Sequence, residues 1–146
     1  MKRNRVLGSL VAGVVATAGT LVAATPAQAV YQCRSDEVCF YEHSGETGSV
    51  AVLASLSPRH GGGYPNAVLD FRQGLYTNGK NLNDSASSVV NNTDFYLSVY
   101  ENVGGASPGK WVYVRPRAWG NLVEMNDMAS AAALSCDPKQ STCESE

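Results

Sequence analysis

The hydrophobic residues of this chain follow two different patterns, one before residue 30 and one after it. From Val6 to Ala24 the chain is apolar and uncharged, whereas beyond Ala29 the apolar residues come in short groups separated by Gly, Asn, Pro and Ser. No stretch of the second region keeps the 3.6-residue period of an amphipathic helix over a useful length. Short apolar groups bounded by turn residues are typical of β-strands, so an all-β domain is predicted.

Five groups carry the strand signal most clearly, because they are rich in β-branched and aromatic residues. The segment Met128–Leu134, with its four alanines, is compatible with one helical turn or with a last extended segment. Ser57–Gly79 is a long excursion with many breakers around a short apolar patch, and loops of this length are often functional. An inserted strand with a surface loop is the alternative. The predicted strands cover residues 38–41, 50–53, 88–90, 95–100 and 111–115.

An internal repeat organises the region after residue 29. The Tyr-Glu pair and two following glycines of Tyr41–Gly48 return in Tyr100–Gly109, and Leu82–Ser88 is echoed in the same order by Met125–Ala131. Tyr41 and Asn83 are 42 positions apart in the first copy, whereas Tyr100 and Asn126 are 26 positions apart in the second. The 16 extra residues fit inside the long excursion. Two copies of one supersecondary unit predict a double Greek-key sandwich.

The amino terminus has the features of a secretory signal peptide. Lys2, Arg3 and Arg5 precede the apolar run, Pro26 interrupts it, and residues 27–29 offer a small-x-small cleavage site. A transmembrane segment is the alternative, but the small residues favour cleavage after residue 29 and hence secretion to the extracellular space. The predicted organisation is a signal peptide over 1–29 and a single domain over 30–146, with motifs at about 38–93 and 94–134.

Cleavage changes the charge that a partner would meet. The 146-residue chain has a formal charge of −2, and loss of three cations with the signal peptide leaves −5 on 117 residues. An acidic chain repels phosphate backbones and anionic lipid, so we expect no nucleic-acid partner and no membrane binding after cleavage. A domain of this size is expected to be a monomer.

The four cysteines all follow the predicted cleavage site, and export places them in an oxidising compartment where thiols pair. Three connectivities are open. Local pairing of Cys33 with Cys39 and of Cys136 with Cys143 is favoured, and crossed pairing would tie the two ends of the domain together. Zinc is the rival interpretation, but neither pair has the two-residue gap of a zinc knuckle.

The Asn-Asp-x-x-Ser-Ser run at residues 83–88 is the strongest candidate for cation chemistry. A hard cation such as Ca²⁺ prefers carboxylate, amide, hydroxyl and main-chain oxygens, which this run supplies. The alternative is structural, because Asn, Asp and Ser also satisfy backbone groups in tight turns.

The repeated hairpin and Asn-Asp-x-x-Ser run, over Cys39–Leu134, resembles the βγ-crystallin Greek-key pair, whose bacterial members bind calcium by a double clamp shared between motifs. The Cys33–Glu42 opening, together with secretion and size, is similar to the small bacterial metalloproteinase inhibitors of peptidase inhibitor family 36. The resemblance implies a secreted inhibitor that blocks the cleft of an extracellular protease, in particular a metalloprotease, with a rigid loop.

The same resemblance implies the calcium ligands. The second copy has Ala131 where the last serine of the motif would stand, so one competent and one weakened Ca²⁺ site are expected. The glutamates near the hairpins are expected to contribute main-chain oxygens. The candidate metal residues are Glu42, Asn83, Asp84, Ser87, Glu101, Asn126, Asp127 and Ser130.

An enzyme is not predicted. Residues 105–109 fit the Gly-x-Ser-x-Gly pattern of hydrolases, but Pro108 has no N–H for an oxyanion hole. The hydrolase order also needs a histidine after Ser107, and both histidines precede it. Two other functions stay open: a calcium-binding stability or binding module without inhibitory activity, and a lectin-like or toxin-like binder using exposed aromatics. Trp119 is expected to be partly exposed and Trp111 to fill the core.

Overall fold

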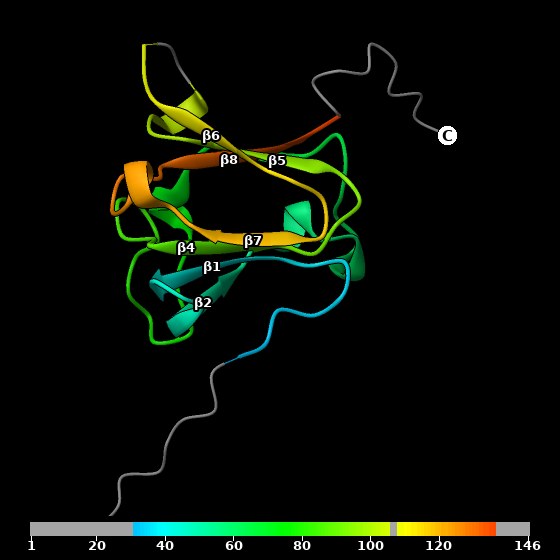
Figure 1. Ribbon diagram of the computed structural model, residues 1–146, viewed down its shortest axis with the longest axis horizontal. Helices are drawn as coiled ribbons and strands as arrows, with labels where there is room; N and C mark the ends of the chain where they lie inside the picture. Colours follow the sequence, from blue (N-terminus) through cyan, green and yellow to red (C-terminus); the bar gives the residue numbers. More distant parts are fainter. Residues whose placement is uncertain (1–30, 106–107, 137–146) are drawn as a thin grey trace, which may run out of the picture.

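The chain folds into two antiparallel four-stranded sheets packed face to face, as the computed structural model shows for residues 31–105 and 108–136 (Figure 1). The predicted signal peptide and Cys143 lie outside these described residues. The strands are β1 (Val38–His43), β2 (Thr47–Val52), β3 (Ala67–Val68), β4 (Ser88–Asn91), β5 (Tyr96–Tyr100), β6 (Trp111–Val114), β7 (Ala118–Asn121) and β8 (Ala131–Ser135).

The order of the strands makes the two halves of the chain exchange one strand each. One sheet has the order β2-β1-β4-β7 and the other β3-β8-β5-β6. Each sheet therefore takes three strands from one half and the third strand of the other half. This arrangement confirms the predicted double Greek-key sandwich, and all five predicted strands are present within a few residues. The undecided alanine-rich segment 128–134 ends in the extended strand β8.

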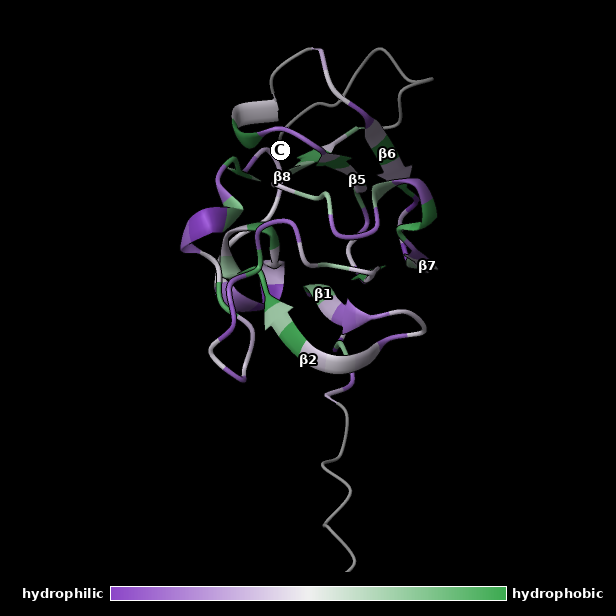
Figure 2. Ribbon diagram, turned by 90° about the vertical axis from the view of Figure 1, so that its left-hand side faces the viewer, coloured by the Kyte–Doolittle hydropathy of each residue, from purple (hydrophilic) through white to green (hydrophobic). Residues whose placement is uncertain are grey.

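The core lies between the two sheets and follows the alternation of the strands. In β1, Val38 and Phe40 face the core and are fully buried, and the ring of Phe40 meets that of Phe71 edge-on at 5.2 Å. Along β2 the colours in Figure 2 change from pale at its start to green towards its end, and the residues become buried in the same direction. The sandwich is thus closed by apolar residues of both halves.

Short 3-10 turns supply the remaining regular structure. Two of them, at residues 58–60 and 71–73, lie with β3 in the predicted excursion, so this segment contains an inserted strand as well as turns. None of the helices in the described part of the chain is long and apolar enough to cross a membrane. The turns are η1 (Ala54–Leu56), η2 (Pro58–His60), η3 (Phe71–Gln73), η4 (Val103–Gly105) and η5 (Val123–Met125).

The first cysteine pair is local, as predicted. Cys33 and Cys39 form a disulfide with their Cα atoms 5.9 Å apart. Because the two sulfurs bond to each other, the nearby group of Cys33, Glu37 and Cys39 does not offer thiolates to zinc. Cys143, the predicted partner of Cys136, lies outside the described residues.

The expectation that Trp111 fills the core is wrong. On β6 the valines at 112 and 114 face the core, so alternation turns Trp111 and Tyr113 outward, where 55% of Trp111 is exposed. The two rings meet at 4.7 Å on the outer face. Trp119 is 59% exposed, which confirms the expectation for it.

Candidate functional site

The start of the long excursion is fixed to the amino-terminal segment by one buried carboxylate, Glu37, which has no exposed surface. Its oxygens accept hydrogen bonds from the Tyr31 hydroxyl at 2.8 and 3.0 Å and from the Arg34 backbone N–H at 2.8 Å. Nε2 of His60 lies 2.8 Å from Oε1, and Nε of Arg59 lies 3.6 Å from the same oxygen. We call these five residues the Glu37 cluster.

Burial is the largest influence on the Glu37 carboxyl group and by itself raises its pKa. The hydrogen bonds from the Arg34 N–H, from Tyr31 and from His60 favour the charged form, and together they outweigh burial. The pKa of Glu37 therefore lies below the ordinary value of 4.5. The cluster holds turn η2 in place with a charged, fully bonded carboxylate.

Beyond η2, a turn at residues 64–65 leads into an extended stretch that includes β3; we call residues 65–70 the edge segment. β3 pairs with β8 and stands at the end of its sheet. Because β-strand side chains alternate, Val68 packs on the core while Ala67 is exposed and Leu69 is 47% exposed. The segment thus presents Ala67 and Leu69 to solvent on the outer side of the last strand of the sheet.

Both ends of the edge segment are anchored by aromatic rings. On one side Tyr64 stacks on Phe95 with ring centroids 5.1 Å apart. On the other side Phe71 is fully buried, and its N–H donates to the Ser130 carbonyl at 2.9 Å. Between them the Leu69 carbonyl accepts the N–H of Gly104 at 2.6 Å, which ties the segment to the β5–β6 hairpin. These contacts hold an exposed stretch of backbone in one conformation.

The two Asn-Asp runs lie side by side and are related to each other by reciprocal backbone bonds. The Asp84 N–H donates to the Ala129 carbonyl, and the Asp127 N–H donates to the Ala86 carbonyl, both at 3.1 Å. The two aspartates share a left-handed backbone, with φ of 53° and 54°. The repeat detected in the sequence is therefore a repeat of conformation.

The structure brings candidate metal residues of both copies together in one open pocket of about 550 Å³. The Ser130 hydroxyl donates to Oδ1 of Asp84 at 2.9 Å. Asp84 thus bonds to a serine of the other copy and not to Ser87 of its own run. Oδ1 of Asn83 is buried and has no hydrogen-bond partner within the described residues. The pocket is lined by Asn83, Asp84, Glu101, Asn102, Val103, Asp127, Met128 and Ser130.

Glu42 and Ser87 do not line that pocket, and Glu101 lines it while its carboxylate makes a further contact. Ser87 donates its hydroxyl to the main-chain carbonyl of Glu42 at 3.0 Å, and the carboxylate of Glu42 is bound by Lys80 and Asn78. The carboxylate of Glu101 accepts the Lys110 N–H at 2.7 Å.

In the second copy, Asn126 donates to the carboxylate of the adjacent Asp127 at 2.7 Å. The last position of the run explains a difference between the copies. Ser88 donates to the His43 carbonyl and accepts the Glu46 N–H, so its hydroxyl braces the first hairpin. Ala131 cannot repeat that brace in the second copy.

Sequence reasoning missed the two groups that fix the excursion. Glu37 ends the polar run Arg34–Glu37, and a run of this composition predicts a solvent-exposed turn. Phe71 is separated from the apolar patch before it by Asp70, and nothing local marks it as an anchor. Both positions are defined by contacts with residues distant in the chain, which no period or motif reveals.

The architecture places the chain among proteins of the βγ-crystallin fold. It is similar to a solved structure described under "Evolution of the eye lens beta-gamma-crystallin domain fold", with a TM-score of 0.55 and 19% identity over 74% of this chain and 94% of that chain. The model of peptidase inhibitor family I36 matches residues 26–114, and the chain therefore belongs to this family. No curated protein compared with the chain matches it. Membership in an inhibitor family gives the chain a protease as its partner and fits a non-enzymatic role.

Proposed function

We propose that this protein inhibits a metalloprotease by placing its edge segment, residues 65–70, in the substrate cleft. The observation that carries the proposal is the anchoring of an exposed, extended backbone at both ends, by Tyr64 and Phe71. The metalloprotease inhibitors that the sequence resembles make this protease class the first target to test. Secretion would bring inhibitor and protease together outside the cell.

Rigidity is the physical reason that such a segment inhibits. A flexible loop loses conformational entropy when a protease binds it, whereas a loop already held in its bound form avoids much of that cost. The side chains of Ala67 and Leu69 face solvent, where a protease cleft can reach them. Leu69, exposed beside the fixed Gly104 contact, is the side chain best placed to enter a subsite.

The substitution Leu69→Asp tests this assignment. A carboxylate in place of a half-exposed leucine should raise the inhibition constant at least tenfold without loss of folding, since an apolar subsite does not solvate a charge. Inhibition is measured by titrating a thermolysin-type protease with the mature protein, and a subtilisin-type protease tests the class.

Leu75→Asp is the matched control, because Leu75 is 59% exposed and lies outside the edge segment, in a β-bridge with Asn81. It should inhibit as the unmodified protein does. Equal inhibition by both variants would place the contact elsewhere on the molecule. Absence of inhibition across metallo- and serine proteases would refute the proposed function itself.

A second candidate function, calcium binding, is favoured by the orphaned Asn83 oxygen in the shared pocket. We propose that Asn83, Asp84, Glu101 and Ser130 hold one Ca²⁺. Their carboxylate, amide, hydroxyl and main-chain oxygens are the donors that a hard cation takes. When bound, the ion would supply positive charge between two acidic turns. Since the residues come from both copies, binding would stabilise the contact between the halves.

Calcium at one hundred times its dissociation constant should then add about 2.7 kcal/mol to the free energy of unfolding. Asp84→Ala should abolish the gain, because it removes the charged ligand. Asp94→Ala is the control, since that carboxylate is bound by Arg117 and neither residue lines the pocket. Calorimetric titration and melting with calcium measure both variants. A gain that persists in Asp84→Ala would contradict the assignment.

A further inference from the structure

The two halves of the sandwich differ in how the gap beside their third strand is closed. In the first half the chain leaves β2 and forms η1, which lies against β3 and buries Leu56 completely. In the second half only residues 115–117 connect β6 to β7. The 16 additional residues of the first copy thus include a cover that the second copy lacks.

Core side chains at equivalent positions are more exposed in the second half, where the cover is missing. The strand registers make Ala51 and Leu53 the counterparts of Val112 and Val114. Ala51 and Leu53 are 3% and 7% exposed, whereas both valines are only partly buried although they face the core. The partly buried valines therefore mark an opening into the sandwich between β6 and β7.

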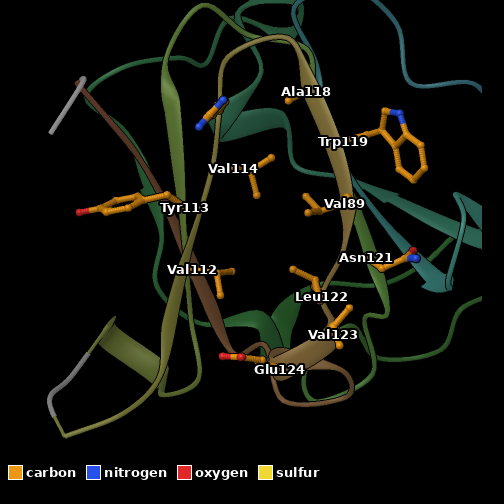
Figure 3. Close-up of a pocket in the computed structure, with 12 residues that line it drawn as sticks. Val89, Val112, Tyr113, Val114, Ala118, Trp119, Asn121, Leu122, Val123 and Glu124 are labelled. Carbon is orange, nitrogen blue, oxygen red and sulfur yellow. The ribbon is translucent and has the colours of Figure 1, made fainter. Parts of the chain in front are cut away.

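That opening is a pocket of about 380 Å³. Figure 3 shows Val112 and Val114 facing Val89 and Leu122 across it, while Trp119 points away from it. Gly120 lines the same pocket, because it pairs with the buried Val89 in the β4–β7 ladder and so shares its face. A Cβ built on Gly120 meets no atom within 4 Å. At the equivalent position the first half has Val68, which packs on the core.

Both walls of the pocket are edge strands with backbone groups to spare. Along an antiparallel ladder every second residue turns its backbone N–H and C=O away from the neighbouring strand. Glu101 and Lys110 are a hydrogen-bonded pair of the β5–β6 ladder, so the N–H and C=O of Tyr113 point to the free side of β6. In the β4–β7 ladder the Leu122 N–H donates to the Ser87 carbonyl, so the N–H and C=O of Trp119 point to the free side of β7. No backbone hydrogen bond joins β6 to β7 within the described residues.

The ends of the opening carry opposite charges. Figure 3 shows Glu124 at the Val112 end. Arg115 also lines the pocket and directly follows Val114, at the other end, where the chain turns from β6 into β7. An apolar floor, free backbone on the walls and one charge of each sign at the ends are complementary to an extended peptide with aliphatic side chains, an acidic residue at one end and a basic residue at the other.

We propose that the β6–β7 opening binds such a peptide from another protein, in the place that η1 occupies in the first half. The peptide hydrogen-bonds to the free backbone groups of the open edge and buries a leucine against Val89 and Leu122, as η1 buries Leu56 in the first half. This site is distinct from the edge segment, so its failure leaves the proposed inhibition untouched.

The probe is a fluorescein-labelled hexapeptide, Lys-Leu-Ala-Ser-Leu-Glu, whose four central residues copy residues 53–56 of the chain. Fluorescence polarisation with the mature protein should show saturable binding. A peptide with both leucines replaced by aspartate should bind at least tenfold more weakly, since charges do not enter an apolar pocket.

Gly120→Val is the decisive variant. It places the side chain of Val68 at the equivalent position, where there is room for it, so the fold should be kept or stabilised. Peptide affinity should fall at least tenfold, whereas Leu75→Ala, on a remote exposed residue, should leave it unchanged. Protease inhibition should be the same in both variants.

Three results would overturn the proposal. One is the absence of saturable binding, and another is equal affinity of Gly120→Val and the unmodified protein. The third is a dimer in light scattering that Gly120→Val dissociates, because a second copy of the chain would then be the occupant.

Discussion

Glu37→Ala is expected to lower the free energy of unfolding by about 3 kcal/mol. The substitution deletes three hydrogen bonds to a buried charged group, each worth about 1.5 to 3 kcal/mol and not additive. It also leaves the Arg34 N–H without its acceptor, whereas the exposed side chains of Arg59 and His60 can form hydrogen bonds with water instead. Urea denaturation of the two proteins measures the difference.

The same carboxylate makes the protein sensitive to acid. Because the pKa of Glu37 is lower in the folded protein than in the unfolded chain, its contribution is fully present above the unfolded value of 4.5. It is lost as the pH falls through the lower folded value. Glu37→Gln, which cannot ionise, should therefore lose stability less steeply than the unmodified protein below pH 4.5.

Glu124→Ala is the control for both experiments, since Glu124 is exposed. Its stability and its acid response should match those of the unmodified protein within about 0.5 kcal/mol. A Glu37→Ala protein as stable as Glu124→Ala would show that the cluster is not what fixes turn η2.

Phe71→Ala is expected to cost about 4 kcal/mol of the free energy of unfolding. A phenylalanine with no exposed surface leaves a large cavity when truncated, and the edge-on contact with Phe40 is lost as well. The variant should also inhibit proteases poorly at temperatures where it stays folded, because the edge segment loses one of its two anchors. Thermal melting and inhibition titration measure the two effects.

Val123→Ala provides the comparison, since 82% of that side chain is already in solvent. Phe71→Leu keeps most of the buried volume and separates anchoring from packing. It should recover much of the stability and part of the inhibition. Full inhibition by Phe71→Ala would remove the anchoring from the proposed mechanism.

The fold was predictable because the sequence repeats its own local rules. Tyr41 and Tyr100 open equivalent hairpins, and Asp84 and Asp127 adopt the same left-handed turn, so pattern and conformation agree. The sequence also named most residues of the shared pocket. It did not show that Asp84 reaches Ser130 instead of Ser87, because that choice is made by packing between the halves.

The exposure of Trp111 could not be predicted from the sequence. Alternation along β6 allows either face to be buried, and an aromatic residue favours the core on average. Val112 and Val114 occupy the inner face instead, and the tryptophan is left outside. The register with β5 decides between the two arrangements, because it pairs Val112 and Val114 with the buried Val99 and Leu97.

The exchange of β3 and β7 between the sheets has a consequence for synthesis. A nascent chain that ends after β4 has left the ribosome without β7, so one side of its first sheet is an unpaired edge, and β3 has no β8 to pair with. The first sheet can be completed only after β7 emerges, and the second only after β8 emerges. The two repeats are alike in conformation, yet they cannot serve as independent folding units.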